Sequence, residues 1–422
     1  MNIPDKIRTI RNKLGLTQDY LAYKVGYTSS HIGKLENGSR TMTDEILEKI
    51  KKALGIADVP LTPGEIKAFE QELYNWRDLI NAWCLGEAGE IREDLKRRAE
   101  LSQDQDLRVL YLLICIGFFR AVGDNHSADD VMAEIEAMGD ELTAEHKLRL
   151  LIVKGTDKAY AHNYKEALSD LLTAELINDE LKIANAGLYH NIAICLTDLG
   201  YAHRACDYIA KVRSFGKETE MLEIHCNMMQ AINYGNIERY EEAIDLLKSC
   251  MFLQKSRPSQ APVMASICNG FGYVYMKAED YAKALENFNK ALEHIEEGSW
   301  DYLHTLYYMS QSLYKSGDVD ASDDLLNKGI ALASENDVTS IMFNAAKHLR
   351  NLDNDLSLAY IENTAIPGIK KFGRYIWIIE YCNKLKDFYK GRRKYRVALK
   401  YSEMANDYHK NIIEGRDLRG KT

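Results

Sequence analysis

The feature that most limits the fold of this 422-residue chain is a helical pattern that recurs about every 38 residues over much of its length. Its copies share one plan, in which an aromatic residue is followed three positions later by Ala, and then by a large and a small residue. The clearest copies are NYKEALSDLLTAE (163–175), RYEEAIDLLKSC (239–250), DYAKALENFNKALE (280–293) and KYRVALKYSEMA (394–405). A pattern that stays in phase over this distance predicts a tandem array of helix pairs, each burying its apolar face against the next.

Each of these segments is preceded by a second helical segment with a small residue twelve positions before the Ala. The small residues allow the two helices of a pair to cross closely. Their spacings are 38, 38, 41 and 38 residues, and the longest spacing contains the segment RPSQAP (257–262). The positions are Gly155, Ala193, Ala231, Gly272 and Ser310. Stepping by 38 in both directions reaches Gly117 and Leu79, then His348, where the pattern is poor, and Lys386.

These copies resemble the tetratricopeptide repeat, whose usual period is about 34 residues. The copy over 261–293 matches five consensus positions of that family, at Gly272, Tyr275, Ala284, Phe288 and Ala291. The longer period adds about one helical turn to each repeat. No alternating strand pattern interrupts the helical segments of the sequence. The predicted fold class is therefore all-α, and the resemblance implies a right-handed superhelical solenoid with a concave inner wall.

The first 56 residues carry a different pattern, in IRTIRNKLGLTQDYLAYKVGYTSSHIGKLENGSR (7–40). Thr17 can cap one short helix, and Gly26 supplies a turn. Thr28 can cap a second helix, which Asn37 and Gly38 end. A further helix, TDEILEKIKKALGI (43–56), closes a small apolar core. Helix, short turn with Gly and helix is the arrangement of a DNA-binding unit.

This segment resembles the helix-turn-helix of phage repressors and other Cro-like, Xre-type regulators over about residues 3–56. The resemblance implies that its second helix enters the major groove of double-stranded DNA. It implies phosphate contacts from Gln18 and Asn37 and base contacts from the start of the second helix. The DNA-binding residues so implied are Gln18, Thr28, Ser29, Ser30, His31, Lys34 and Asn37. The serines have a short reach, which predicts modest base discrimination, and His31 either meets a phosphate or points to solvent.

Arg11 and Glu36 stand where relatives of that family form an internal ion pair, so Arg11 is not counted among the base-reading residues. An alternative hypothesis is that the head does not bind DNA and is instead a helical dimerisation or docking module. Charge favours the DNA-binding reading. Residues 1–56 carry ten Lys and Arg against six Asp and Glu, whereas the whole chain has a formal charge of −9. A basic head on an acidic body predicts that the head meets a polyanion.

Prolines mark the predicted domain boundary. The stretch ADVPLTPGE (57–65) contains two of the six prolines of the chain and follows the basic head. The predicted domains are therefore a helix-turn-helix over 1–56, a linker over 57–65, and a repeat domain for sensing and dimerisation over 66–422.

A DNA-reading head followed by a long helix-pair array resembles the peptide-pheromone regulators of Gram-positive bacteria, the Rap–Rgg–NprR–PlcR–PrgX group. The resemblance implies quorum sensing, in which the body binds a short signalling peptide and gates DNA binding. A bound extended peptide needs side-chain amides and hydroxyls as partners for its backbone. The predicted contacts on the inner wall are Tyr160, His190, Asn191, Asn236, Asn269, Tyr273, Lys277, Tyr307, Tyr308 and Gln311. Any one of them can equally be a solvated residue or a contact between helices.

The sequence contains no phosphate-binding loop, zinc-protease motif or nucleophile elbow, so no enzyme, cofactor or metal is expected. Its eight cysteines form no C-x-x-C pair and are expected to be reduced and mostly buried. No apolar run reaches the length of a membrane span, and the N-terminus has no signal-peptide core, which predicts a cytoplasmic protein without a membrane partner.

Three functions stay open at this point. The first is a peptide-gated transcriptional regulator acting as a homodimer through its repeats. The second is an interaction protein that sequesters a partner such as a response regulator. The third is a prophage-type repressor whose array serves only oligomerisation.

Overall fold

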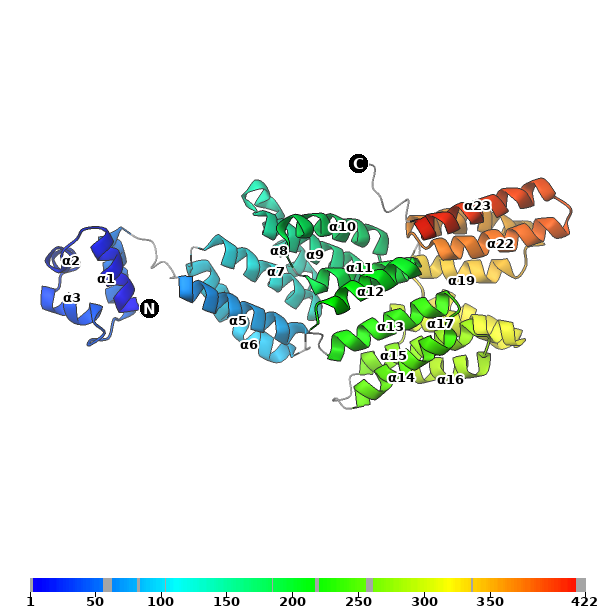
Figure 1. Ribbon diagram of the computed structural model, residues 1–422, viewed down its shortest axis with the longest axis horizontal. Coiled ribbons are helices and arrows are strands. Elements are labelled where there is room, and N and C mark those ends of the chain that lie inside the picture. Colours follow the sequence, from blue (N-terminus) through cyan, green and yellow to red (C-terminus); the bar gives the residue numbers. More distant parts are fainter. Residues whose placement is uncertain are drawn as a thin grey trace. The chain divides into compact units, whose positions relative to one another are not determined.

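The structure, a computed structural model, describes most of the chain, in the ranges 3–55, 63–81, 84–102, 104–183, 185–216, 220–255, 261–334 and 337–414. Every regular element in these ranges is a helix, which confirms the all-α fold class (Figure 1). No described helix is long and apolar enough to cross a membrane. The chain divides into two compact units, Met1–Val153 and Lys154–Thr422. The predicted linker lies outside the described residues over 57–62, and the predicted domain limits stay predictions.

The N-terminal head has four helices: α1 (Ile3–Lys13), α2 (Gln18–Val25), α3 (Ser29–Glu36) and α4 (Asp44–Leu54). The predicted caps are confirmed. The hydroxyl of Thr17 accepts a hydrogen bond from the amide of Tyr20 at 3.1 Å, and that of Thr28 accepts one from the amide of His31 at 3.2 Å. Gly26 ends α2 with φ of 76°, which is the left-handed conformation that glycine adopts without strain.

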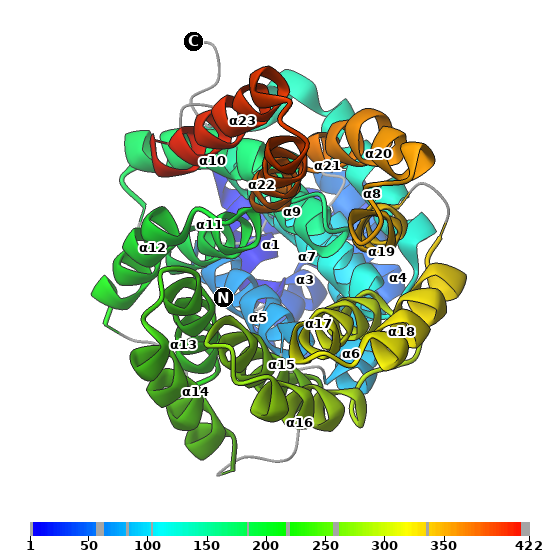
Figure 2. The same ribbon diagram turned by 90° about the vertical axis from the view of Figure 1, so that its right-hand side faces the viewer.

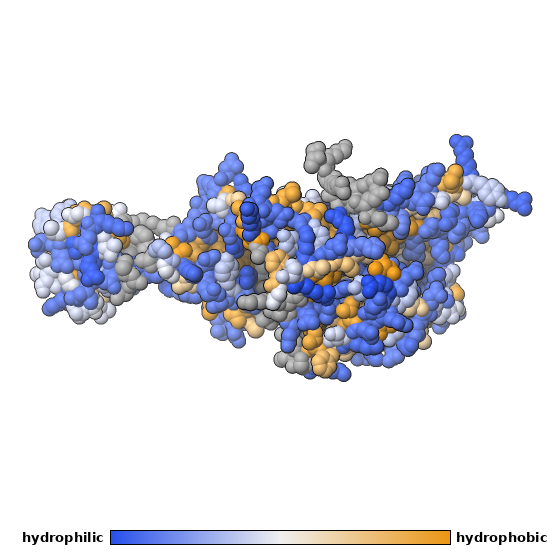
Figure 3. Space-filling view, in the orientation of Figure 1, coloured by the Kyte–Doolittle hydropathy of each residue, from blue (hydrophilic) through white to orange (hydrophobic). Residues whose placement is uncertain are grey.

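The head buries a small apolar core between its four helices. Ile7, Leu21, Ile32, Leu35 and Ile50 are fully buried there, one or two from each helix. The visible face of the head is mainly hydrophilic (Figure 3). These features give the head its own core, so it does not depend on the repeats for burial of apolar surface.

The rest of the first unit begins the helix-pair array. Its elements are α5 (Pro63–Asn81), α6 (Leu85–Leu101), α7 (Gln105–Ala121), α8 (Asn125–Ala137), the short 3₁₀-helix η1 (Gly139–Glu141) and the first part of α9 (Ala144–Tyr160). Most residues of α7 between Leu107 and Phe118 are apolar and buried against its neighbours. Trp76 anchors this cluster, since its indole N–H donates to the carbonyl of Ala88 at 2.9 Å and its ring stacks on Tyr111.

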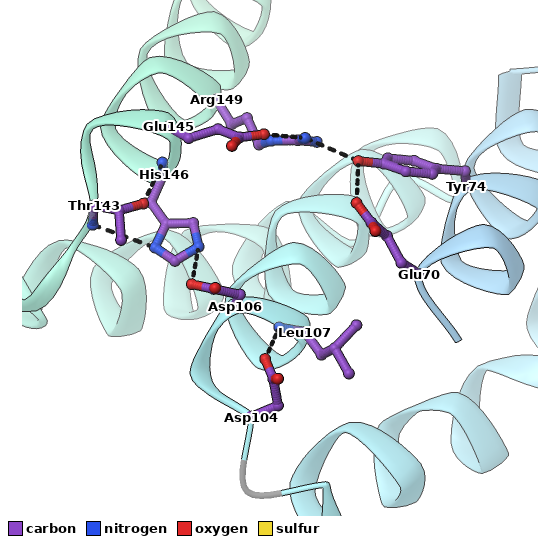
Figure 4. Close-up of polar contacts among 9 residues, drawn as sticks. All are labelled: Glu70, Tyr74, Asp104, Asp106, Leu107, Thr143, Glu145, His146 and Arg149. Atoms are coloured by element: carbon purple, nitrogen blue, oxygen red, sulfur yellow. Dashed lines mark hydrogen bonds and ion pairs between the residues drawn. The ribbon is translucent and has the colours of Figure 1, made fainter. Parts of the chain in front are cut away.

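A polar network ties α5 to the start of α9 in this unit (Figure 4). Arg149 donates to the hydroxyl of Tyr74 at 2.8 Å and pairs with Glu145, and Tyr74 donates to Glu70. The neighbouring His146 is buried and lies 3.1 Å from a carboxylate oxygen of Asp106. These bonds fix α9, the first helix that also contributes residues to the second unit.

The second unit stacks helix pairs. Its elements after α9 are α10 (Tyr164–Leu181), α11 (Ala186–Leu199), α12 (Ala202–Ser214), α13 (Glu220–Asn236), α14 (Tyr240–Lys255), α15 (Ala261–Lys277), α16 (Tyr281–Leu292), α17 (Trp300–Ser316), α18 (Val319–Leu332), α19 (Val338–Leu349), α20 (Asp355–Tyr360), the π-helix η2 (Ile361–Ala365), α21 (Ile366–Lys371), α22 (Tyr375–Gly391) and α23 (Tyr395–Glu414). In Figure 2 the first helix of each pair, such as α11, α13, α15 and α17, lies nearer the centre than the second.

The five small positions from Gly155 to Ser310 are buried, whereas Gly117, reached by extending the period, is exposed and has no close neighbour within 4 Å of a Cβ placed there. A side chain added at Gly272 would place its Cβ 2.5 Å from the ring of Phe288, and one at Gly155 would lie 2.6 Å from Leu171. The poor copy near His348 has a structural reason, because α20, η2 and α21 replace one regular helix there. The longer spacing at RPSQAP falls on a connection whose residues 256–260 lie outside the described part.

Candidate functional site

The start of α3 has the residue composition of a DNA-contacting helix face. Ser30 and Lys34 are exposed there, and Ser29 is half-buried behind the Thr28 cap. Asn37 ends the helix and accepts hydrogen bonds from the amide and hydroxyl of Ser39. The structure therefore places these predicted contacts on one exposed helix and its C-terminal turn.

A buried polar network braces this helix from behind. Arg11 donates to both carboxylate oxygens of Glu36, at 2.6 and 3.0 Å, which confirms the predicted ion pair. Gln18 donates to the same carboxylate at 2.8 Å. The side-chain hydrogen bond with Glu36 raises the pKa of Arg11. One N–H of Gln18 is thus engaged inside the head, and only its remaining polar atoms are free for the phosphate contact that the resemblance implies.

His31 packs its ring against Tyr27, with 4.4 Å between centroids, and does not extend fully into solvent. Desolvation and the nearby charges of Arg40 and Lys34 lower its pKa. Arg40 is therefore a second exposed cation close to α3, beside Lys34. Sequence reasoning missed Arg40, although its place in LENGSR, directly after the helix, was a usable signal.

The inner wall of the second unit, meaning the first helices α9, α11, α13, α15 and α17, carries a row of amide–hydroxyl bonds. Each bond joins two consecutive inner helices. The four pairs are Asn191 to Thr156 at 2.7 Å, Asn233 to Thr197 at 2.8 Å, Tyr273 to Asn236 at 2.5 Å and Thr305 to Asn269 at 3.0 Å. The predicted peptide contacts Asn191, Asn236 and Asn269 are therefore also contacts between repeats.

These amides keep unused hydrogen-bonding capacity. Asn269 and Asn236 each accept one bond through the side-chain oxygen, and within the described part of the chain their NH₂ groups, each with two donors, make no hydrogen bond. Asn191 donates to Thr156 and also bonds His190, whose ring stacks on His225 at 5.8 Å. Burial lowers the pKa of His190 to about 4, so it is neutral at physiological pH. The wall thus presents neutral donors and acceptors, which suit a peptide backbone.

Aromatic residues fill the wall between α15 and α22. Tyr273 and Tyr308 meet edge to face at 5.2 Å, and Tyr307 is almost fully buried against Trp377. Lys277 lies 5.9 Å from the Tyr273 ring. Gln311 is half-buried, and its side-chain nitrogen has no partner among the described residues. Tyr160, at the end of α9, is strongly exposed.

A cavity of about 610 Å³ lies beside the wall, within the second unit. It is lined by the turn after α9, the start of α17, the connection between α18 and α19, and the end of α21, including His162, Trp300, Asp337 and Lys371. None of the ten predicted peptide contacts is among its described lining residues. His162 stacks on Trp300 with 4.0 Å between ring centroids.

This stack predicts a pH effect on stability. Burial, with a smaller contribution from the charge of Arg374, lowers the pKa of His162 to about 4. Between pH 6.5 and 4 the unfolded chain therefore binds a proton at His162 that the folded chain does not, and stability falls as pH falls, by up to about 1.4 kcal/mol per pH unit. The His162→Asn variant, which tolerates the φ of 59° found here, should lose that part of the slope in urea unfolding. Between pH 7 and 8 both proteins should behave alike, and equal slopes between pH 5 and 6 would contradict the assignment.

Comparison with known proteins matches both parts of the chain. The family described as Helix-turn-helix matches residues 7–59. Transcriptional activator NprA of Geobacillus stearothermophilus is 21% identical over 413 residues, which cover 91% of this chain and 98% of NprA. Regulatory protein RapD of Bacillus subtilis is 25% identical over 198 residues, 45% of this chain and 54% of RapD.

Solved structures match the fold. The crystal structure of NprR with its cognate peptide NprX has a TM-score of 0.69 at 20% identity and covers 81% of this chain and 99% of NprR. A Rap protein complexed with competence and sporulation factor has a TM-score of 0.70 at 17% identity, covering 83% and 99%. The chain thus combines a helix-turn-helix segment with the helix-pair fold of Rap and NprR, which confirms the resemblance stated from the sequence.

Proposed function

We propose that the protein is a cytoplasmic transcriptional regulator that binds a short signalling peptide on its inner wall and changes its DNA binding in response. It acts as a homodimer through the repeats. One observation supports this proposal most directly. The same chain contains the helix-turn-helix α2–α3 and an inner wall whose neutral amides keep unused hydrogen-bonding capacity. Similarity to known proteins supports the proposal, since they include a transcriptional activator and a protein solved in complex with its cognate peptide.

The chemistry of the wall favours a peptide over a charged metabolite. Apart from Lys277, its predicted contacts are amides, phenols and the imidazole of His190, and burial lowers the pKa of that ring and of the adjacent His225, which favours the uncharged form of both. Such groups satisfy backbone N–H and C=O groups without needing a counter-charge.

The proposal is tested with the full-length protein and a library of synthetic free hexapeptides. Peptides retained by the protein are identified, and the best is titrated calorimetrically. DNA binding to the protein's own upstream region is then measured with and without that peptide. Absence of any retained peptide would exclude the sensor role, and equal DNA binding in both conditions would exclude gating. A protein partner recovered without promoter binding would instead support sequestration.

The amide–hydroxyl bonds of the inner wall allow a more specific test of peptide binding. Asn269→Ala removes both a donor group for the peptide and the bond to Thr305. It should weaken binding of the best hexapeptide by about 1–3 kcal/mol. Thr305→Val removes the bond between helices, together with the Thr305 bond to the carbonyl of Asp301 inside α17, and keeps both the Asn269 side chain and the volume at position 305. Calorimetry should therefore show a larger loss for Asn269→Ala than for Thr305→Val. Equal losses would mean that Asn269 acts by positioning α15 and α17, without contacting the peptide. The same comparison applies to Asn191 and Thr156.

The exposed lysine of α3 predicts a contact with DNA phosphate, whose contribution to affinity depends on salt concentration. Lys34 is exposed on α3, and its replacement by Ala should reduce the slope of log affinity against log salt by about 1, as expected for one lost phosphate contact. The matched control is Lys52→Ala, an exposed lysine on α4. Filter binding or fluorescence anisotropy at four salt concentrations measures the slope. An unchanged slope for Lys34→Ala, or an equal change for Lys52→Ala, would remove α3 as the DNA-contacting helix.

A further inference from the structure

The end of the inner wall beyond Tyr273 carries a group of lysines. Three helices that border the central region of the second unit in Figure 2 each bring one lysine there: Lys277 on α15, Lys315 on α17 and Lys384 on α22. Lys315 and Lys384 are exposed, and Lys277 is half-buried. Lys277 lies 5.9 Å from the centroid of the Tyr273 ring, whose hydroxyl donates to Asn236. The charged end therefore begins next to the row of amide–hydroxyl bonds.

Glu380, also on α22, shows that the three lysines lie close together. Desolvation by the surrounding side chains raises the pKa of its carboxyl group, while the charges of Lys384, Lys277 and Lys315 lower it. Burial raises the pKa of two phenols of the wall, Tyr273 on α15 and Tyr307 on α17, and the charge of Glu380 adds to the rise at both. Glu380 therefore lies toward α15 and α17, among the three lysines.

The cluster has an excess of positive charge. Three lysines surround one glutamate, and within the described part of the chain none of these four side chains forms an ion pair. By contrast, Lys290 on α16, the second helix of its pair, lies 2.7 Å from a carboxylate oxygen of Glu286. A concave surface strengthens the effect of such an excess, because low-dielectric walls on several sides focus the electric field. This end of the wall therefore attracts an anion.

Gln311 adds a further hydrogen-bond donor to the same place. It lies one helical turn before Lys315 on the same face of α17, and its side-chain nitrogen is buried without a partner among the described residues. A buried donor without an acceptor is unfavourable, so a ligand that accepts a hydrogen bond from it is favoured. Ammonium groups beside an amide suit a carboxylate, which accepts several hydrogen bonds at once and carries the opposite charge.

We propose that Lys277, Gln311, Lys315 and Lys384 form a subsite for a carboxylate of the bound peptide, whose backbone lies along the neighbouring neutral amides. The carboxylate is the C-terminal group or an Asp or Glu side chain, and Glu380 competes with it for the lysines. The subsite presupposes the peptide-binding function proposed above and adds that the peptide is anionic where it meets α15, α17 and α22.

The test uses the full-length protein and one set of hexapeptides synthesised in two forms, with a free C-terminal carboxylate and as the C-terminal amide. Retained peptides are identified by mass spectrometry. Retention of the free-acid form alone assigns the subsite to the C-terminal carboxylate. Retention of both forms, with enrichment of Asp or Glu at one position, assigns it to a side chain.

The best retained peptide is then titrated calorimetrically, together with a neutral counterpart in which a carboxamide replaces the carboxylate. In Lys277→Gln/Lys315→Gln the carboxylate peptide should bind about tenfold more weakly, as expected for lost charge-assisted hydrogen bonds, and the neutral counterpart should change by less than about twofold. Glu380→Gln removes the competing charge and should strengthen binding of the carboxylate peptide roughly threefold. The control Lys400→Gln replaces an exposed lysine of α23 and should bind like the wild type.

Retention of peptides without any preference for a carboxylate would overturn the subsite and leave the sensor role intact. Retention of no peptide in either form would exclude the sensor role itself, and the subsite with it. Equal weakening of both peptides in Lys277→Gln/Lys315→Gln would also overturn the subsite, because the lysines would then only shape the wall. If circular dichroism shows that the double variant does not fold, Glu380→Gln keeps the test decisive, since unchanged or weaker binding there contradicts the subsite.

Discussion

Replacing Glu36 with Ala is expected to unfold the head while the repeats stay folded. Glu36 is 1% exposed and holds both Arg11 and Gln18. Its loss leaves the buried guanidinium of Arg11 without a counter-charge, which costs roughly 3–5 kcal/mol. A domain of this size has a total stability of roughly 3–8 kcal/mol, so the deficit removes most or all of it. Hydrogen exchange measured by mass spectrometry should lose protection in α1–α4 only.

Two controls separate the missing counter-charge from the missing volume. The double variant Arg11→Met/Glu36→Leu replaces the pair by apolar side chains and should regain protection, because such replacements of buried pairs are often neutral or stabilising. Glu45→Ala breaks an exposed pair with Lys49 in the same head and should change stability by at most about 0.5 kcal/mol. A fully protected head in Glu36→Ala would show that the ion pair contributes little.

The second large effect is expected at a crossing of two helices in the repeats. In Gly329→Ala the new Cβ would lie 2.2 Å from two ring atoms of Phe343, which is fully buried and has no room to move. Overpacking of this kind costs about 1–3 kcal/mol or more. Urea unfolding of the full-length protein should therefore show a lower midpoint for the transition that reports on α18 and α19.

Replacing a different helical glycine with Ala should have the opposite effect on the free energy of unfolding. Gly187, also helical, would place a Cβ no closer than 3.6 Å to Asn185, which is an ordinary contact. Gly187→Ala should therefore stabilise the protein by about 0.4–1 kcal/mol, through the lower entropy of the unfolded chain. Destabilisation of equal size at both positions would mean that steric crowding at Phe343 is not the cause.

Local order in this protein could be predicted from its sequence. The caps at Thr17 and Thr28 and the turn at Gly26 depend on a few consecutive residues. The small residues at the crossings, such as Gly272, recur about every 38 residues. Because helix pairs contact mainly their neighbours, the period was enough to predict the helix pairs and the face of each that is buried. The Arg11–Glu36 pair was also expected, from a family resemblance.

The candidate sites were predicted less completely, because their bonding depends on how elements meet. The sequence marked Asn191 and Asn269 as inner-wall residues but gave no means to see that each bonds the next inner helix. The sequence also marked Gln18 as a DNA contact, but it did not show that Gln18 donates a hydrogen bond to Glu36, which occupies one of its N–H groups.

The hydrogen bond from Arg374, before α22, to the carbonyl of Asp198 on α11 joins residues 176 positions apart and had no local signal in the sequence. It depends on the pitch of the superhelix, which is the sum of small rotations at several successive repeat interfaces. A change of a few degrees at each interface would separate α11 from α22 without altering any single helix. Periodicity therefore specifies the helices and their pairing, whereas the accumulated packing of whole repeats determines which distant side chains meet.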